Sequence, residues 1–149
     1  MLQKKTMKPI TVTTTISAPI AKVWEQWNKP EHIVHWAFAS DDWEAPSAEN
    51  DLRVGGAFKT VMAAKDKSGS FDFTGTYTNI VPNQLIEYDM TRAPHEQVSR
   101  HVKILFTETP EGVQLTETFD PENENTEEMQ KNGWQSILDN FKKYVESNK

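Results

Sequence analysis

An amphipathic stretch near the C-terminus, MQKNGWQSILDNFKKYV at residues 129–145, most constrains the fold of this chain. At about 100° per residue, most polar side chains fall on one side of a helix, and the other side carries Trp134, Ile137, Leu138, Phe141, Tyr144 and Val145. The acidic segment DPENENTEEM precedes it and suits a helix N-terminus. We therefore predict a helix over about 126–147 that covers an apolar surface.

Gly133 lies inside this apolar stripe, although a glycine within a helix costs about 1 kcal/mol relative to alanine. Two interpretations stay open. Either a neighbouring backbone comes very close to the helix at Gly133, or the missing side chain opens one end of a cavity that Trp134 walls.

The rest of the chain is predicted to form a strand, a pair of short helices and then consecutive strands. The segment PITVTTTIS alternates β-branched residues, and SAPIAKVWEQWN and KPEHIVHW have helix-start signals. Residues 36–50 lack a clean period and are predicted to be a long loop. Strands with turn-like connections between them are predicted at 51–64, 70–80, 84–92, 97–107 and 113–119.

Consecutive short strands with short connections predict an antiparallel meander, and period two gives it one apolar face. The predicted C-terminal helix is the only large amphipathic element left to cover that face. The expected fold class is α+β, a curved sheet around a long C-terminal helix with two short helices. We expect a single domain over residues 1–149, with its core at about 9–147 and a cavity where the twisted sheet leaves the straight helix.

Two aromatic or glycine-rich segments carry further expectations. Trp36, Phe38 and Trp43 in the predicted loop are too apolar to leave in water, so they should be mostly buried. The VGG of residues 54–56 lacks the Lys and Ser/Thr of a phosphate-binding loop, and a bulge or strand bend explains it better.

Composition excludes several classes of function. The net charge is −6 and no Lys/Arg cluster interleaves with aromatics, which argues against nucleic acid or an anionic membrane as a partner. Without cysteine there is no disulfide or thiolate chemistry. His32 and His35 have no third ligand at a metal-binding spacing, and no motif for a cofactor appears, so we expect neither. No stretch is long enough to span a membrane and no signal-peptide core is present, so a cytoplasmic location is expected.

Five segments resemble the family homologous to the activator of the heat-shock-protein-ninety ATPase: ISAPIAKVWEQWNKPEHIVHW, NDLRVGGAFKTVMAAKD, FDFTGTYTNI, IEY and EEMQKNGWQSILDNFKKYVE. The resemblance covers about residues 9–147 and places the chain in the START-like, or SRPBCC, superfamily. It implies the helix-grip fold and a deep, largely apolar cavity. The stretch AFASDDWEAP is similar to bacterial members of unassigned function.

Arg100 and Glu117 both fall in phase with the apolar faces of neighbouring strands. Because inward charges are costly unless paired, we expect them within salt-bridge reach of each other. They would form either a salt bridge at the sheet's end or a polar anchor that orients a carboxylate or carbonyl of a ligand.

The expected function is binding of an apolar or amphipathic small molecule between sheet and helix. The candidate ligand-binding residues are Trp24, Trp27, Trp36, Phe58, Tyr77, Tyr88, Arg100, Glu117, Trp134 and Phe141. Two alternatives stay open. One is a co-chaperone-like module with a protein partner or as a homodimer, and the other is a cyclase- or hydrolase-type enzyme that uses Glu117 as an acid/base group. We assign no catalytic residue and regard an enzyme as the less favoured interpretation.

Overall fold

The fold is described from a computed structural model that covers residues 8–92 and 99–147. Its elements in chain order are β1 (Ile10–Ile16), α1 (Ile20–Asn28), α2 (Pro30–Ile33), β2 (Trp43–Asn50), β3 (Ala57–Ala64), β4 (Ser70–Val81), β5 (Leu85–Met90), β6 (His101–Thr109), β7 (Gly112–Phe119) and α3 (Glu127–Ser147). The start of the strand predicted at 97–107 and most of the connection before it lie outside the described residues.

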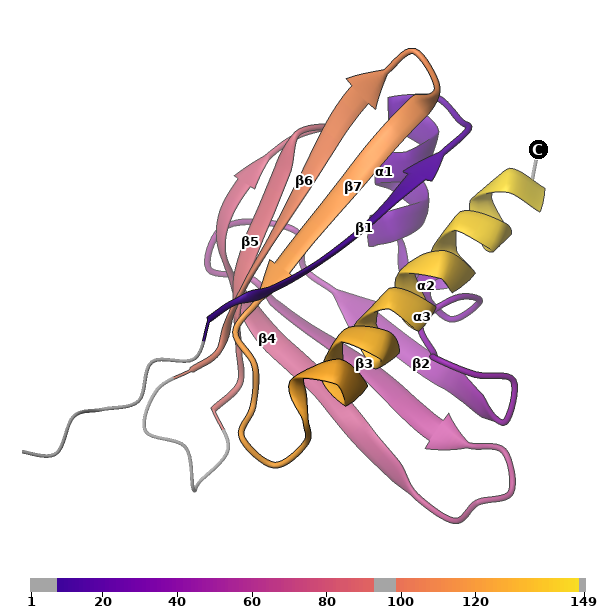
Figure 1. The fold of residues 1–149 in the computed structure, drawn as a ribbon, viewed down its shortest axis with the longest axis vertical. Coiled ribbons are helices and arrows are strands. Elements are labelled where there is room, and N and C mark those ends of the chain that lie inside the picture. The colour runs from indigo at the N-terminus through magenta and orange to yellow at the C-terminus, as the bar shows by residue number, and fades with distance from the viewer. Residues whose placement is uncertain (1–7, 93–98, 148–149) are drawn as a thin grey trace, which may run out of the picture.

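The strands form one seven-stranded antiparallel sheet in the order β1-β7-β6-β5-β4-β3-β2. From β2 to β7 each strand pairs with the next along the chain, and β1 joins the free edge of β7. Figure 1 shows the sheet strongly bent, with α3 running across its concave side. The expected fold class is therefore confirmed.

Helix α3 begins where the acidic segment predicts. The Thr126 Oγ1 accepts a hydrogen bond from the Met129 amide at 3.1 Å, which satisfies one of the free N–H groups of the first turn. Glu127 and Glu128 complement the positive end of the helix dipole. The apolar stripe is buried through Leu138, Phe141 and Val145, each with 0% exposure, so the predicted helix is confirmed.

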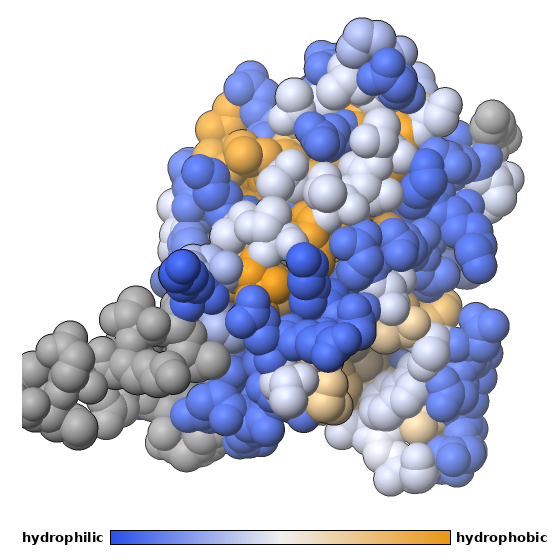
Figure 2. All heavy atoms as spheres, in the orientation of Figure 1, coloured by the Kyte–Doolittle hydropathy of each residue, from blue (hydrophilic) through white to orange (hydrophobic). Residues whose placement is uncertain are grey.

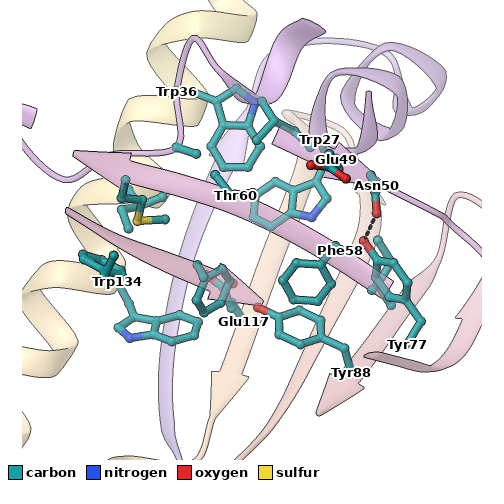
Figure 3. A pocket seen from close by; sticks show the side chains of 17 residues that line it. Trp27, Trp36, Glu49, Asn50, Phe58, Thr60, Tyr77, Tyr88, Glu117 and Trp134 are labelled. Atoms are coloured by element: carbon teal, nitrogen blue, oxygen red, sulfur yellow. Dashed lines mark hydrogen bonds between the residues drawn. The ribbon is translucent and has the colours of Figure 1, made fainter. Parts of the chain in front are cut away.

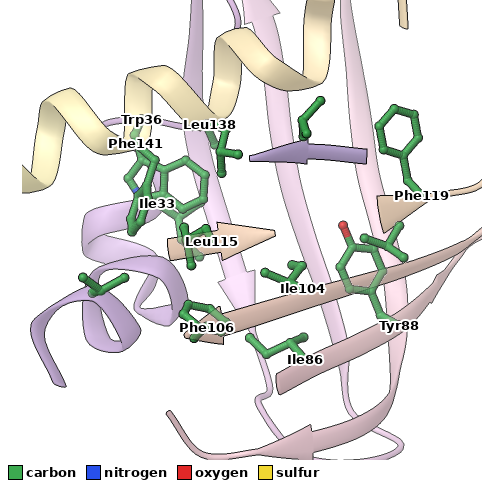
Figure 4. Close-up of a cluster of buried hydrophobic side chains, with 14 of the residues drawn as sticks. Ile33, Trp36, Ile86, Tyr88, Ile104, Phe106, Leu115, Phe119, Leu138 and Phe141 are labelled. Carbon is green, nitrogen blue, oxygen red and sulfur yellow. The ribbon is translucent and has the colours of Figure 1, made fainter. Parts of the chain in front are cut away.

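The core lies between the concave face of the sheet and the helices. Alternate residues of β5, β6 and β7 are buried, and these inward side chains meet Leu138 and Phe141 of α3 (Figure 4). The face of the molecule seen in Figure 2 is mostly hydrophilic, with apolar surface in small separate areas. Burial of the apolar stripes is thus what joins sheet and helix.

The predicted loop at 36–50 is partly wrong, because residues 43–50 form the edge strand β2. Two features hide the alternation of inward and outward side chains in the sequence of β2. Pro46 lacks an N–H to donate, which an edge strand tolerates, and the register shifts between Glu44 and Ser47 as it does at a β-bulge. A bulge changes which face the following residues occupy, so alternation across it is lost.

The strand predicted at 51–64 also needs correction. It begins only at Ala57, and residues 51–56 connect β2 to β3. The VGG segment therefore belongs to a connection and not to a bend within a strand. Gly55 takes a φ of +86° there, and the Gly56 amide donates to the Arg53 carbonyl at 2.8 Å.

Candidate functional site

A cavity of about 200 Å³ lies between the concave sheet, α3 and the segment after α2. Strands β3, β4 and β5 form its floor and contribute Phe58, Thr60, Tyr77 and Tyr88 (Figure 3). Trp27 of α1, Trp36 after α2 and Trp134 of α3 enclose it from the helical side. Most of this lining is aromatic or aliphatic, so the cavity favours an apolar occupant.

Seven of the ten predicted site residues line this cavity: Trp27, Trp36, Phe58, Tyr77, Tyr88, Glu117 and Trp134. Trp24, Arg100 and Phe141 do not line it. Phe141 is fully buried in the core, where it meets the rings of Trp27 and Trp36 with centroids 4.9 and 4.8 Å away. Trp24 packs edge-on against Phe106 with centroids 5.0 Å apart, beyond the cavity.

The predicted adjacency of Arg100 and Glu117 is wrong. Glu117 lies opposite Ile104 in the β6–β7 ladder, and Val102 lies opposite Phe119. Arg100 precedes Ile104 by four residues, which at the rise of a strand is roughly 13 Å along the chain. The two residues are therefore neither opposite nor diagonal neighbours, and a polar anchor in the cavity rests on Glu117.

Glu117 occupies an aliphatic environment. Its neighbours across the strands are Val12 on β1 and Ile104 on β6, followed by Ile86 on β5, and all three are at most 1% exposed. Glu117 itself is 5% exposed, and no described residue offers its carboxyl group a hydrogen bond or a cation. Burial raises the pKa of Glu117 to about 8, so its side chain is a neutral carboxylic acid at neutral pH.

The two tyrosines of the cavity floor, Tyr77 and Tyr88, are also protonated at neutral pH. Burial raises the pKa of Tyr88 well above its usual value, and the nearby Glu117 charge raises it further. Burial likewise raises the pKa of Tyr77, against the opposing effect of its hydrogen bond to Asn50. The Tyr77 hydroxyl donates to Asn50 Oδ1 at 2.5 Å, and Asn50 Nδ2 donates to the Asn28 carbonyl at 2.7 Å. Asn50 thereby joins β4, β2 and the end of α1 at the cavity wall.

Ring stacking holds the aromatic walls in place. Trp27 and Trp36 stack with centroids 4.7 Å apart, and the Trp36 Nε1 donates to the Gln26 carbonyl at 2.9 Å. Trp134 stacks on Phe119 at 3.9 Å and 9°. Trp36 is buried as predicted, whereas Phe38 and Trp43 are only partly buried and do not line the cavity.

Sequence reasoning missed several lining residues for different reasons. Thr60, Met62, Phe73 and Ile86 share the inward phase of their strands with chosen residues, so period two could have found them. Asn50 and Glu49 lie in the segment interpreted as a loop, where no phase could be assigned.

Gly133 faces open space. A Cβ built on it meets no atom within 4 Å, so the interpretation of a close backbone approach is wrong. Gly133 is not among the lining residues either, although the next residue, Trp134, is. The glycine therefore marks space beside the helix at the place where Trp134 turns into the cavity.

Among residues 8–92 and 99–147, no three His, Cys, Asp or Glu side chains are arranged to hold a metal ion. His32 instead shares a hydrogen bond between its Nδ1 and the Tyr144 hydroxyl at 2.7 Å. No helix in the described part of the chain is long and apolar enough to cross a membrane.

Comparison with known proteins places these features in a family. The family described as Activator of Hsp90 ATPase homolog 1-like protein matches residues 17–146. No curated protein matches the chain. An AHSA1-like protein from Aeromonas hydrophila is 41% identical, covers 94% of this chain and 93% of its own, and superposes with a TM-score of 0.85.

Two further solved structures are similar over most of the chain. A protein from Cytophaga hutchinsonii is 48% identical over 94% of this chain and 93% of its own, with a TM-score of 0.78. A protein from Chromobacterium violaceum is 24% identical over 93% of this chain and 97% of its own, with a TM-score of 0.81, and supports the fold alone.

Proposed function

The chain belongs to the family of Activator of Hsp90 ATPase homolog 1-like proteins, and from its cavity we propose that it binds an apolar or amphipathic small molecule. The observation that carries this proposal is a preformed cavity of about 200 Å³ walled by stacked aromatic rings. An apolar cavity of about 150 Å³ is enough to hold benzene. A ligand of one or two rings with a short polar extension fits this volume.

The lining supports binding of such a ligand because it combines large apolar area with few polar groups. Trp27, Trp36 and Trp134 offer rigid ring surfaces, so little side-chain entropy is lost when a ligand packs on them. The tyrosine hydroxyls and Glu117 supply the polar contacts that orient a ligand.

A titration with 4-phenylbutanol tests this proposal. We expect saturable shifts of the amide resonances of cavity residues in NMR spectra, and quenching of tryptophan fluorescence. Thr60→Phe places a ring in the cavity and should weaken binding at least tenfold, whereas Thr107→Phe on the exposed side of β6 should not. Unchanged binding by Thr60→Phe, in a variant that keeps its native spectrum, would contradict the proposal. Native mass spectrometry of protein from its own host would identify a copurified ligand.

The co-chaperone-like alternative predicts a different effect of the cavity-filling variant Thr60→Phe. A protein-binding module would act through its exterior, so Thr60→Phe would leave partner binding unchanged. The presence of an open cavity favours the small-molecule proposal over this one.

A catalytic role is the second candidate, because burial gives Glu117 a pKa of about 8, in the range that acid/base catalysis needs. It predicts that Glu117→Gln keeps binding of neutral ligands while abolishing turnover of a ligand identified by mass spectrometry.

A further inference from the structure

We propose, building on the function proposed above, that the cavity selects an apolar molecule with a protonated amine, which pairs with the Glu117 carboxylate. This assigns a charge and a chemical class to the ligand. Where Glu117 is ionised, it also excludes fatty acids and other carboxylates, since two negative charges would then meet in an apolar space.

The charges of the lining support this choice. Among the described residues, those that line the cavity include Glu117 of β7 and the exposed Glu49 where the lining reaches solvent, and no Lys, Arg or His. Both of these carboxyl groups are acids, so each can carry a negative charge and neither can carry a positive one. A cationic ligand complements the ionised forms of these two carboxyl groups, whereas a neutral ligand offers neither of them an opposite charge.

In the described part of the chain, the surroundings of Glu117 offer its carboxyl group no charged partner. The strands on either side present aliphatic side chains, Val12 and Ile104, and no described group donates a hydrogen bond to its carboxyl. An ammonium group brings both the opposite charge and three N–H donors. The pairing would satisfy a carboxyl group to which the described residues offer no partner.

The aromatic walls add a second attraction for a cation. Figure 3 shows Glu117 between Trp134 and Tyr88, with the Tyr88 oxygen toward it. Trp134 is anchored on Phe119, two residues along β7 from Glu117, so its ring stays near the carboxyl. The face of an aromatic ring attracts an ammonium group most strongly where water is excluded.

Binding of the ammonium ion is linked to loss of one proton. In the free protein the pKa of Glu117 is about 8, so pairing with an ammonium ion releases its proton. The other described titratable groups near it do not change charge in this range: Tyr88 of β5, which interacts electrostatically with Glu117, and Tyr77 of β4 beside Tyr88 both have raised pKa values. Helix α3 contributes only the apolar Trp134 and Ile137 to the lining. Affinity for an amine should therefore rise about tenfold per pH unit between about pH 6 and 8, and then level off.

The test is calorimetric titration with three compounds that share one apolar body: 4-phenylbutylamine, 4-phenylbutanol and 4-phenylbutanoate. At about pH 8 the amine should bind at least tenfold more tightly than the alcohol, and the carboxylate most weakly. Near pH 6.5, repeat titrations in buffers of different ionisation enthalpy should show about one proton released per amine bound. Glu117→Gln should lose both the preference for the amine and its pH dependence, while Glu108→Gln, an exposed carboxylate on β6, should keep them.

Three results would each overturn the inference: equal or tighter binding of the carboxylate, amine affinity that does not change with pH, or a preference retained by Glu117→Gln. The proton-release measurement uses the native chain, so it stands even if that variant folds poorly. Suppose that 4-phenylbutanol binds the native chain, that Thr60→Phe blocks this binding, and that 4-phenylbutylamine binds no more tightly than the alcohol. The inference about the amine then fails and the proposed function survives. If the alcohol also fails to bind, both fail.

Discussion

Glu117 is a carboxylic acid among aliphatic side chains, and its protonation couples the cavity to the stability of the fold. Its pKa is about 8 in the folded chain, against about 4.5 when exposed. The folded state therefore holds this proton more tightly than the unfolded state does. The stabilising contribution is complete below about pH 4.5, declines as pH rises and is lost above about pH 8.

Replacing Glu117 by glutamine should remove this pH dependence, because an amide does not ionise. At about 1.4 kcal/mol per pKa unit, the variant should gain on the order of 3–4 kcal/mol relative to the native chain between pH 5 and 8. Chemical denaturation at both pH values measures the difference. A gap between variant and native chain that stays constant with pH would show that Glu117 is not buried as a neutral acid.

Gly133 offers a second test at the residue scale. Since a Cβ there meets no atom within 4 Å, Gly133→Ala should stabilise α3 by about 1 kcal/mol through helix propensity alone. Thermal unfolding should show an increase in Tm, and binding of 4-phenylbutanol should stay unchanged because Gly133 does not line the cavity. A lower Tm would mean that the helix approaches a neighbour here after all.

At the scale of the elements, strand β4 places a glycine directly against a ring of the cavity floor. A Cβ on Gly75 would lie 2.6 Å from the Phe58 ring of β3 and 2.7 Å from the Asp89 carbonyl oxygen of β5. The ring of Phe58 packs directly on the backbone of Gly75, and this contact positions it against Tyr88 at 4.7 Å.

Gly75→Ala should therefore displace Phe58 and destabilise the chain by about 1–3 kcal/mol, the usual cost of overpacking. Binding of 4-phenylbutanol should weaken as well, because Phe58 lines the cavity. Gly69→Ala is the matched control, since a Cβ there meets no atom within 4 Å. Equal Tm values for the two variants would contradict the proposed packing.

For the molecule as a whole, the shifted groups predict how stability changes with pH. Burial lowers the pKa of His101, but its hydrogen bonds to Asp89 and Glu87 raise it more, so the net shift is upward. Its contribution is complete below about pH 6.5 and is lost as pH rises through the folded pKa, in the same direction as that of Glu117. Glu87 acts oppositely, because its hydrogen bond to His101 lowers its pKa and its contribution is lost as the solution becomes acidic.

The chain should accordingly be most stable near pH 5 and lose stability as the pH rises from about 5 to 8. Thermal melts from about pH 4 to 9 measure this profile. His101→Gln should reduce the slope above pH 6 only slightly, since the pair is partly exposed, and Glu117→Gln should reduce it strongly. A stability maximum at pH 8 or above would contradict the assignment of both groups.

The sequence by itself determined the helix at the C-terminus and the meander of strands, because both are written in local periods. Residues of α3 repeat their apolar side every turn, and buried positions alternate along β5, along β7 and along β6 as far as Phe106. The two-residue alternation of the strands also predicts that four candidate residues point to one face of the sheet: Phe58, Tyr77, Tyr88 and Glu117. The edge strand β2 escaped detection because Pro46 and a bulge break its alternation.

Only the tertiary structure decided which inward residues reach the cavity. Register between β6 and β7 separates Arg100 from Glu117, and no local signal in either strand encodes that pairing. The curvature that leaves space below α3 depends on irregularities in β2 and β4, near Glu44 and Tyr77, and on where the helix crosses the sheet. Trp27 and Phe141 are equally apolar in sequence, yet one lines the cavity and the other fills the core, because contacts between distant elements set their places.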